Sequence, residues 1–254
     1  MAGIGFELKK LFNRRTLTGH AMAYGYSAVI TAGPFALLTT MVLAIQLLFL
    51  RYGIDVNNSQ LYVSSVIYPF VFSQLISCGF SIIITRYLAD CLYEGEYDNV
   101  SGSCYGIIFM AQLAGAAAAL LFYWDKPLPL HLKLITYTFF AEMIAMWLQM
   151  VYLTALKDYK SIFGSYFAGA ATSIVLTWLN LQYGFMAPVE GTMLSMCIGV
   201  GVLDLCFMVQ IVRYFGYPSH ARKFGFLPYF EQHYKLFLLI IFPLPCGTAR
   251  FHFG

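Results

Sequence analysis

Long apolar runs separated by short polar segments dominate the chain. Six of them reach the roughly 20 residues that a helix needs to cross a bilayer, and they cover 21–50, 61–87, 101–124, 132–156, 161–181 and 192–212. Inside lipid, only helices and closed barrels satisfy the backbone's hydrogen bonds. Continuous runs of this length predict helices, so the expected fold is all-α: a polytopic membrane bundle of about six transmembrane helices.

The two ends of the chain predict different elements. In residues 1–20, apolar residues at helical spacing lie among basic ones, which is typical of an amphipathic helix on the cytoplasmic membrane surface. The six-helix transmembrane lobe then occupies 21–212. A polar cytoplasmic linker is expected at 213–235. Residues 236–254 begin a seventh apolar run, which prolines interrupt before it can span the bilayer.

Composition narrows the class of protein. Hydrophobic residues make up 60% of the 254 residues and charged residues 11%, and the mean hydropathy is +0.70. In soluble domains about 45–50% of the residues are apolar and about 25% are charged. A net charge of +3 without a basic, aromatic surface argues against nucleic acid as a partner. The six cysteines lack metal-ligand spacing and no catalytic or cofactor motif occurs, so we expect a non-enzymatic protein without metal or cofactor.

Basic residues predict the orientation in the membrane. If the N-terminus is cytoplasmic, eleven lysines and arginines fall on the inside: Lys9, Lys10, Arg14, Arg15, Arg86, Lys157, Lys160, Arg213, Arg222, Lys223 and Lys235. Only three fall on the outside: Arg51, Lys126 and Lys133. Because cytoplasmic loops carry the excess of basic residues, a cytoplasmic N-terminus is predicted.

Two acidic residues lie deep in apolar runs, Glu142 in the fourth and Asp204 in the sixth. A charge at the centre of the bilayer costs at least about 2.5–3.5 kcal/mol, so such residues are rare and face a cavity or a partner. Gln149 shares a helical stripe with Glu142, together with His131 and Thr138. Glu142, Asp204 and Gln149 are the candidates for contact with a coupling ion, a proton or the substrate, and the stripe could line a wet pathway. The alternative is a neutral acid hydrogen-bonded between helices.

Arg86, Asp90 and Glu94 follow one another at intervals of four where the second run reaches the cytoplasm. On a helix they form a ladder of charges. Two interpretations remain open: a cytoplasmic gate or docking point for a partner, or a solvated helix end.

Polar and small residues mark two further helix faces. The second run carries Gln74, Ser77, Ser81 and Thr85 on one side. That side is either the wall of a cavity or a site of interhelical hydrogen bonding, and packing is favoured. The fifth run has small residues along one side, and the sixth contains Gly199 and Gly201. Small residues at helical spacing predict close contact between helices.

Four sequence stretches resemble the PelG family, the inner-membrane transport subunits of the Pel exopolysaccharide system of Gram-negative bacteria. They are MAGIGFELKKL at 1–11, TAGP at 31–34, TRYLAD at 85–90 with LYE at 92–94, and LKDYK at 156–160. The resemblance covers about residues 1–235 in the same order and spacing.

This resemblance implies a fold and a function. The family is placed among the multidrug, oligosaccharidyl-lipid and polysaccharide (MOP) flippases, MATE-like transporters with two six-helix lobes that work by alternating access. It implies export of a cationic, amino-sugar-rich polysaccharide for the biofilm matrix across the bacterial inner membrane. It also implies partners: other Pel inner-membrane proteins and a cytoplasmic glycosyltransferase.

The family has about twelve spans, whereas this chain corresponds to the N-terminal lobe, and residues 242–254 do not resemble it. We therefore expect a truncated exporter, since one lobe cannot enclose the cavity that two lobes make. Two alternatives stay open: a flippase of the same superfamily for lipid-linked sugars or small molecules, and an inactive membrane fragment.

Overall fold

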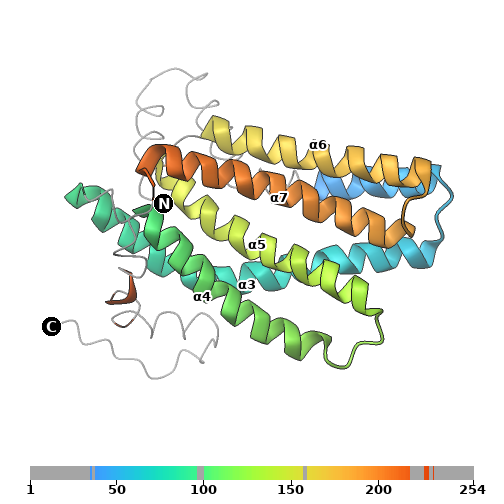
Figure 1. The fold of residues 1–254 in the computed structure, drawn as a ribbon, viewed down its shortest axis with the longest axis horizontal. Helices are drawn as coiled ribbons and strands as arrows, with labels where there is room; N and C mark the ends of the chain where they lie inside the picture. Colours follow the sequence, from blue (N-terminus) through green and yellow to red (C-terminus); the bar gives the residue numbers. More distant parts are fainter. Residues whose placement is uncertain are drawn as a thin grey trace, which may run out of the picture.

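The computed structural model describes residues 35, 38–95, 100–156, 159–217, 226–228 and 231, and in these ranges the ordered elements are helices (Figure 1). Five are long: α3 (Val56–Glu94), α4 (Val100–Tyr123), α5 (Leu130–Leu156), α6 (Tyr159–Tyr183) and α7 (Pro188–Phe215). A shorter apolar helix, Leu38–Arg51, precedes them.

The prediction of an all-α membrane bundle is confirmed. All five long helices are long and apolar enough to cross a membrane. Each contains, to within a residue, the apolar run predicted for it. The first predicted run, 21–50, is described only from residue 38 apart from Phe35. The helix predicted within 1–20, the segment 236–254 and most of the linker at 213–235 lie outside the described residues.

The helices end where the sequence favours an end. Gly95 follows α3 with a left-handed φ of 78°, and its N–H donates to the Cys91 carbonyl. Gly184 follows α6 with a φ of 67°. Such angles favour glycine, which lacks a Cβ. At its start, α7 has Pro188 and Glu190 in the first turn, where proline fits and the helix dipole stabilises a negative charge.

The bundle has two ends, which are named here after these two glycines. The Gly95 end holds the C-terminal ends of α3, α5 and α7, and the Gly184 end holds the connections 52–55, 124–129 and 184–187 (Figure 1). Arg213 lies in the last turn of α7 at the Gly95 end, while Arg51 and Lys126 lie at the Gly184 end. Among the described residues, the basic residues predicted inside and those predicted outside thus lie at opposite ends of the bundle.

Helix α3 is much longer than a bilayer requires. Its 39 residues correspond to about 58 Å at 1.5 Å per residue, against a hydrocarbon core of about 30 Å. Its C-terminal part projects beyond the neighbouring helices at the Gly95 end (Figure 1). The sequence prediction stopped at residue 87 because the apolar run ends there, but the helix continues to Glu94.

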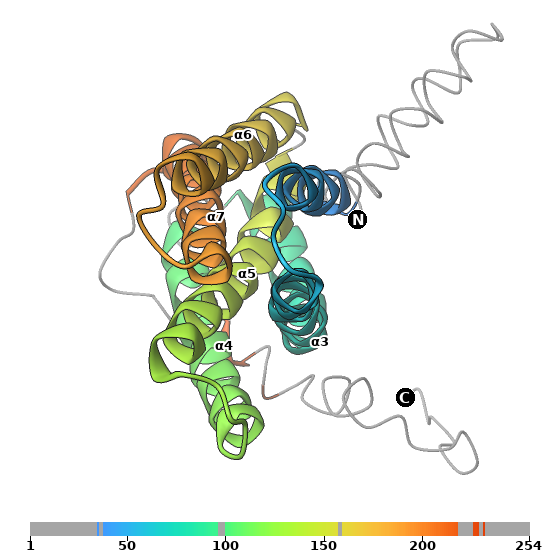
Figure 2. The ribbon, with the colours of Figure 1, turned by 90° about the vertical axis from the view of Figure 1, so that its right-hand side faces the viewer.

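Helix α5 is the centre of the bundle. It packs against α3 and α7 extensively and against α4, while α6 packs mainly on α7 (Figure 2). The α6–α7 contact is close because glycines face it: a Cβ added to Gly169 would lie 2.8 Å from the Gly199 carbonyl oxygen. Side chains buried between the helices form one apolar core, which includes Tyr62, Phe139 and Phe207. The predicted close packing of small residues is confirmed at this pair.

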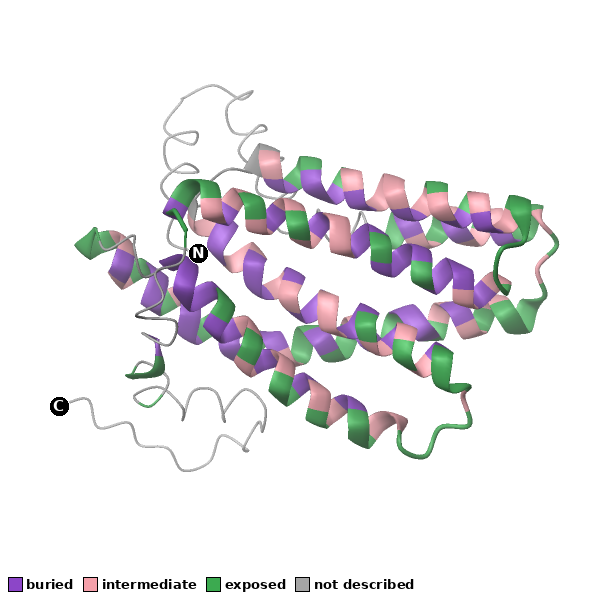
Figure 3. Ribbon diagram, in the orientation of Figure 1, coloured by how far each residue is buried: buried purple, intermediate pink, exposed green. Residues whose placement is uncertain are grey.

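The outward faces of three helices are apolar. Exposed residues include Phe109 and Leu120 on α4, Phe167 and Trp178 on α6, and Leu205 on α7 (Figure 3). Water does not favour such a surface, and lipid does. The arrangement therefore suits a bundle surrounded by membrane on these sides.

Candidate functional site

The two intramembrane acids predicted as candidates meet at the contact between α5 and α7. A Cβ added to Gly201 of α7 would lie 3.5 Å from the Glu142 Oε1 atom of α5. Cys197 and Asp204 lie on the same face of α7, one turn on either side of Gly201, and both are within electrostatic range of Glu142. The Cys197 thiol donates to the Ile135 carbonyl over 3.4 Å. The fold thus brings two separate candidates within electrostatic range of each other, and they are called here the carboxyl pair.

Neither acid of this pair has its polar atoms satisfied. The buried Oε2 of Glu142 and Oδ1 of Asp204 lack a hydrogen-bond partner in the described part of the chain. The one ion pair among the described residues joins His131 of α5 and Glu190 of α7 at the Gly184 end. A buried carboxylate without a counter-charge is strongly disfavoured. Chemically, the pair is able to hold a proton or to bind a cation.

Gln149 lies two turns after Glu142 on α5 and is buried, with 4% of its surface exposed. Its Oε1 atom has no hydrogen-bond partner within the described residues. The other two residues of the predicted stripe, Thr138 and His131, have different partners. The exposed Thr138 hydroxyl donates to the Leu134 carbonyl of its own helix, and His131 pairs with Glu190. These four positions therefore do not share one environment.

Helix α6 adds Tyr166, which the sequence did not single out, and a contact of Ser165, which lies on the small-residue face predicted for packing. Tyr166 lies within electrostatic range of Asp204, and its ring packs edge-on against Phe207 with centroids 5.5 Å apart. Further along α7, the Gln210 amide donates to the Ser165 hydroxyl over 2.9 Å. Helical periodicity reveals faces within one helix, but it does not reveal which helices are neighbours, so these contacts had no sequence signal.

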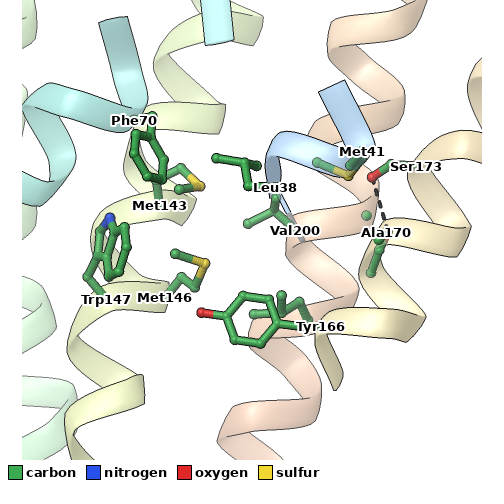
Figure 4. Close-up of a pocket in the computed structure, with 13 residues that line it drawn as sticks. Leu38, Met41, Phe70, Met143, Met146, Trp147, Tyr166, Ala170, Ser173 and Val200 are labelled. Atoms are coloured by element: carbon green, nitrogen blue, oxygen red, sulfur yellow. Dashed lines mark hydrogen bonds between the residues drawn. The ribbon is translucent and has the colours of Figure 1, made fainter. Parts of the chain in front are cut away.

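A small apolar cavity lies on the other side of the α5–α7 contact, closed by α3, α6 and the helix Leu38–Arg51 (Figure 4). Its volume is about 30 Å³, enough for one or two water molecules. Methionine and aromatic side chains dominate the lining: Met41, Phe70, Met143, Met146, Trp147 and Tyr166. Glu142 and Asp204 do not line it, so the carboxyl pair is separate from this cavity.

The predicted charge ladder lies on the projecting end of α3. Arg86 and Glu94 are exposed and Asp90 is half-buried. Within the part of the chain that the structure describes, no ion pair joins them. The described residues also contain no group of three or more His, Cys, Asp or Glu side chains that could hold a metal ion.

Residues 1–243 match the PelG family, described as "Putative exopolysaccharide Exporter (EPS-E)". No curated protein and no solved structure matches the chain. Since the match extends over nearly the whole chain and the bundle has the apolar helices of a membrane protein, the chain belongs to the PelG family.

Proposed function

We propose that this chain takes part in exporting a Pel-type exopolysaccharide across the bacterial inner membrane for the biofilm matrix. The observation that carries the proposal is the family match along residues 1–243. A bundle with five helices able to cross a membrane supports it. In this proposal the N-terminus and the Gly95 end are cytoplasmic, because most basic residues fall in the segments that this orientation places inside.

The carboxyl pair is proposed as the coupling site of an alternating-access cycle. Two negative charges at this depth repel each other and are poorly solvated, so protonation of either Glu142 or Asp204 removes the repulsion and the solvation cost of that acid. The two acids belong to different helices. Protonation therefore changes the interaction between α5 and α7, and it couples proton movement to a change in helix packing.

Partners are proposed at the Gly95 end. The α3 overhang, which carries Arg86, Asp90 and Glu94, extends past the neighbouring helices and presents charges to the aqueous phase. Such a surface suits contacts with the other Pel inner-membrane proteins and with a cytoplasmic glycosyltransferase that supplies the polymer.

The test is the location of the polymer in a strain that lacks the gene. Loss of the exporter is expected to abolish extracellular polysaccharide while the biosynthetic enzymes remain, and the restored gene is expected to return it. Normal extracellular polymer in the deletion strain would contradict the proposal. Loss of a lipid-linked sugar from the outer leaflet, with Pel-type polymer unaffected, would favour the alternative of a small-molecule flippase.

A further inference from the structure

The outward face of α3 differs from the outward faces of the other helices. One row of its exposed residues at one-turn spacing, called here the α3 stripe, mixes polar and apolar side chains: Ser64, Ile67, Val71, Gln74, Cys78 and Ile82. Tyr68, Phe72 and Leu75 are exposed beside this row. At the same depth, α4, α6 and α7 expose apolar residues such as Phe109, Phe167 and Leu205. Within the described surface, the α3 stripe therefore includes an exposed glutamine amide, that of Gln74, which lipid cannot satisfy.

Gln74 lies within the membrane wherever the bilayer is placed along α3. The hydrocarbon core covers about 20 residues of helix, and α3 runs from Val56 to Glu94. If the charges of Arg86 and Asp90 lie outside the hydrocarbon core, the 20-residue segment inside it begins no later than about residue 66. Every such segment contains Gln74.

The Gln74 side chain has no partner that would let it face lipid. It is exposed, and its amide makes no hydrogen bond within the described residues. Two other glutamines donate through their amide nitrogens: Gln112 to the Ala141 carbonyl over 2.6 Å, and Gln210 to the Ser165 hydroxyl over 2.9 Å. An amide needs water or a polar partner, and lipid tails provide neither.

Exposed hydroxyl groups on other helices do not indicate contact with water in the way that the Gln74 amide does. Thr138 of α5 and Thr39 of the first helix are exposed, but each donates to a carbonyl of its own helix, Leu134 and Phe35. A threonine bonded in this way tolerates lipid. A glutamine amide has two donors and an acceptor, so the contrast with Gln74 is one of chemistry and not only of exposure.

We infer that the α3 stripe lines a water-filled path along which a hydroxyl-rich polysaccharide moves. This inference rests on the proposed export function and names the surface that the polymer follows. Hydroxyl and amide groups of a sugar chain exchange hydrogen bonds with water and with Gln74 at little net cost. The neighbouring apolar faces of α4, α6 and α7 would then contact lipid.

Two native cysteines provide the test. Cys78 lies on the α3 stripe and is exposed, whereas Cys206 is half-buried on α7 beside the apolar residue Leu205. A maleimide reacts with a thiolate, which forms in water and not in lipid. In the full-length protein in native membranes, a sulfonated, water-soluble maleimide is expected to label Cys78 at least about tenfold faster than Cys206, the ratio that about 1.4 kcal/mol gives.

An engineered pair extends the comparison to two positions that are both exposed. Gln74→Cys is expected to react like Cys78, and Leu205→Cys, whose parent residue is 67% exposed, is expected to stay unreactive until detergent and denaturant are added. Slow labelling of Cys78 and of the cysteine at 74, equal to that at 205, would overturn the inference, because the stripe would then face lipid or packed protein.

The labelling result is separable from the export test. Labelling of Cys78 does not need polymer to move, so unreactive cysteines on the α3 stripe with export lost in the deletion strain would reject the path and keep the function. If the cysteines react but the deletion leaves export unaffected, the α3 stripe faces water but polysaccharide does not use it.

Discussion

At the scale of single residues, the proposed mechanism rests on the carboxyl pair. Glu142 and Asp204 are distant in sequence, and each has an unsatisfied, buried oxygen in the described structure. Replacing either acid by its amide removes the titratable group and nearly preserves the shape. The amide cannot take up and release a proton, so a coupling site fails while a merely structural site is little changed.

We expect Glu142→Gln and Asp204→Asn each to lower extracellular polysaccharide by about tenfold or more at equal protein level, the effect of an interaction of about 1.4 kcal/mol. The double variant is expected to be no worse than either single one, because the two acids act as a unit. Secreted polymer is the measurement. Thr138→Val, one turn before Glu142 on α5 and exposed, is the control and is expected to export normally. Additive losses would contradict a shared site.

Arg86 tests the proposed docking surface. Arg86→Ala is expected to reduce co-purification of the other Pel inner-membrane proteins several-fold, since an exposed ion pair with a partner contributes up to about 1 kcal/mol, which is roughly fivefold in affinity. The amount of inserted protein is expected to stay unchanged, because Arg86 is exposed and unpaired within the described residues. If capture of partners and export both survive the substitution, the ladder is only a solvated helix end.

At the scale of elements, the α6–α7 contact depends on its glycines. A Cβ on Gly199 would lie 2.6 Å from the Gly169 carbonyl oxygen and would also collide with Ser173. Gly199→Ala is therefore expected to destabilise the bundle by about 1–3 kcal/mol, as overpacking does, and to lower the temperature at which the detergent-solubilised protein aggregates. Gly164→Ala on α6 meets nothing within 4 Å and is expected to be neutral. Equal behaviour of the two variants would contradict the close packing.

How well the sequence predicts each helix depends on what ends it. The run 101–124 agrees with α4 (Val100–Tyr123) to one residue at each end, because polar connections flank it on both sides. The run 61–87 falls short of α3 (Val56–Glu94). Hydropathy reports where lipid ends, whereas the helix ends at the left-handed Gly95, beyond the membrane.

The candidate site was likewise predictable from the sequence only in part. Burial costs alone single out Glu142 and Asp204 from the sequence. Their proximity follows from the packing of α5 on α7, which the sequence does not reveal. The same holds for Tyr166 of α6, which lies near Asp204. Conversely, the predicted stripe from His131 to Gln149 is regular in sequence but is divided in space, because His131 is paired with Glu190 of α7 at the Gly184 end.

At the scale of the whole molecule, orientation is a direct consequence of the basic residues. Alkaline phosphatase fused after Gly184 is expected to be active, since the enzyme works only outside the cytoplasm, and a fusion after Gly95 is expected to be inactive. A fluorescent protein that folds only in the cytoplasm is expected to give the reverse pattern. The opposite result for both reporters would invert the topology and place the α3 overhang outside the cell.

The central claim is that this protein moves polysaccharide through the membrane. Inside-out inner-membrane vesicles from cells that make the polymer test it most directly, because exported polymer enters the vesicle lumen and escapes an added glycoside hydrolase. The account predicts protected polymer in vesicles that contain the protein, much less in vesicles from the deletion strain, and little in vesicles with Glu142→Gln. Equal protection in all three would contradict export by this protein.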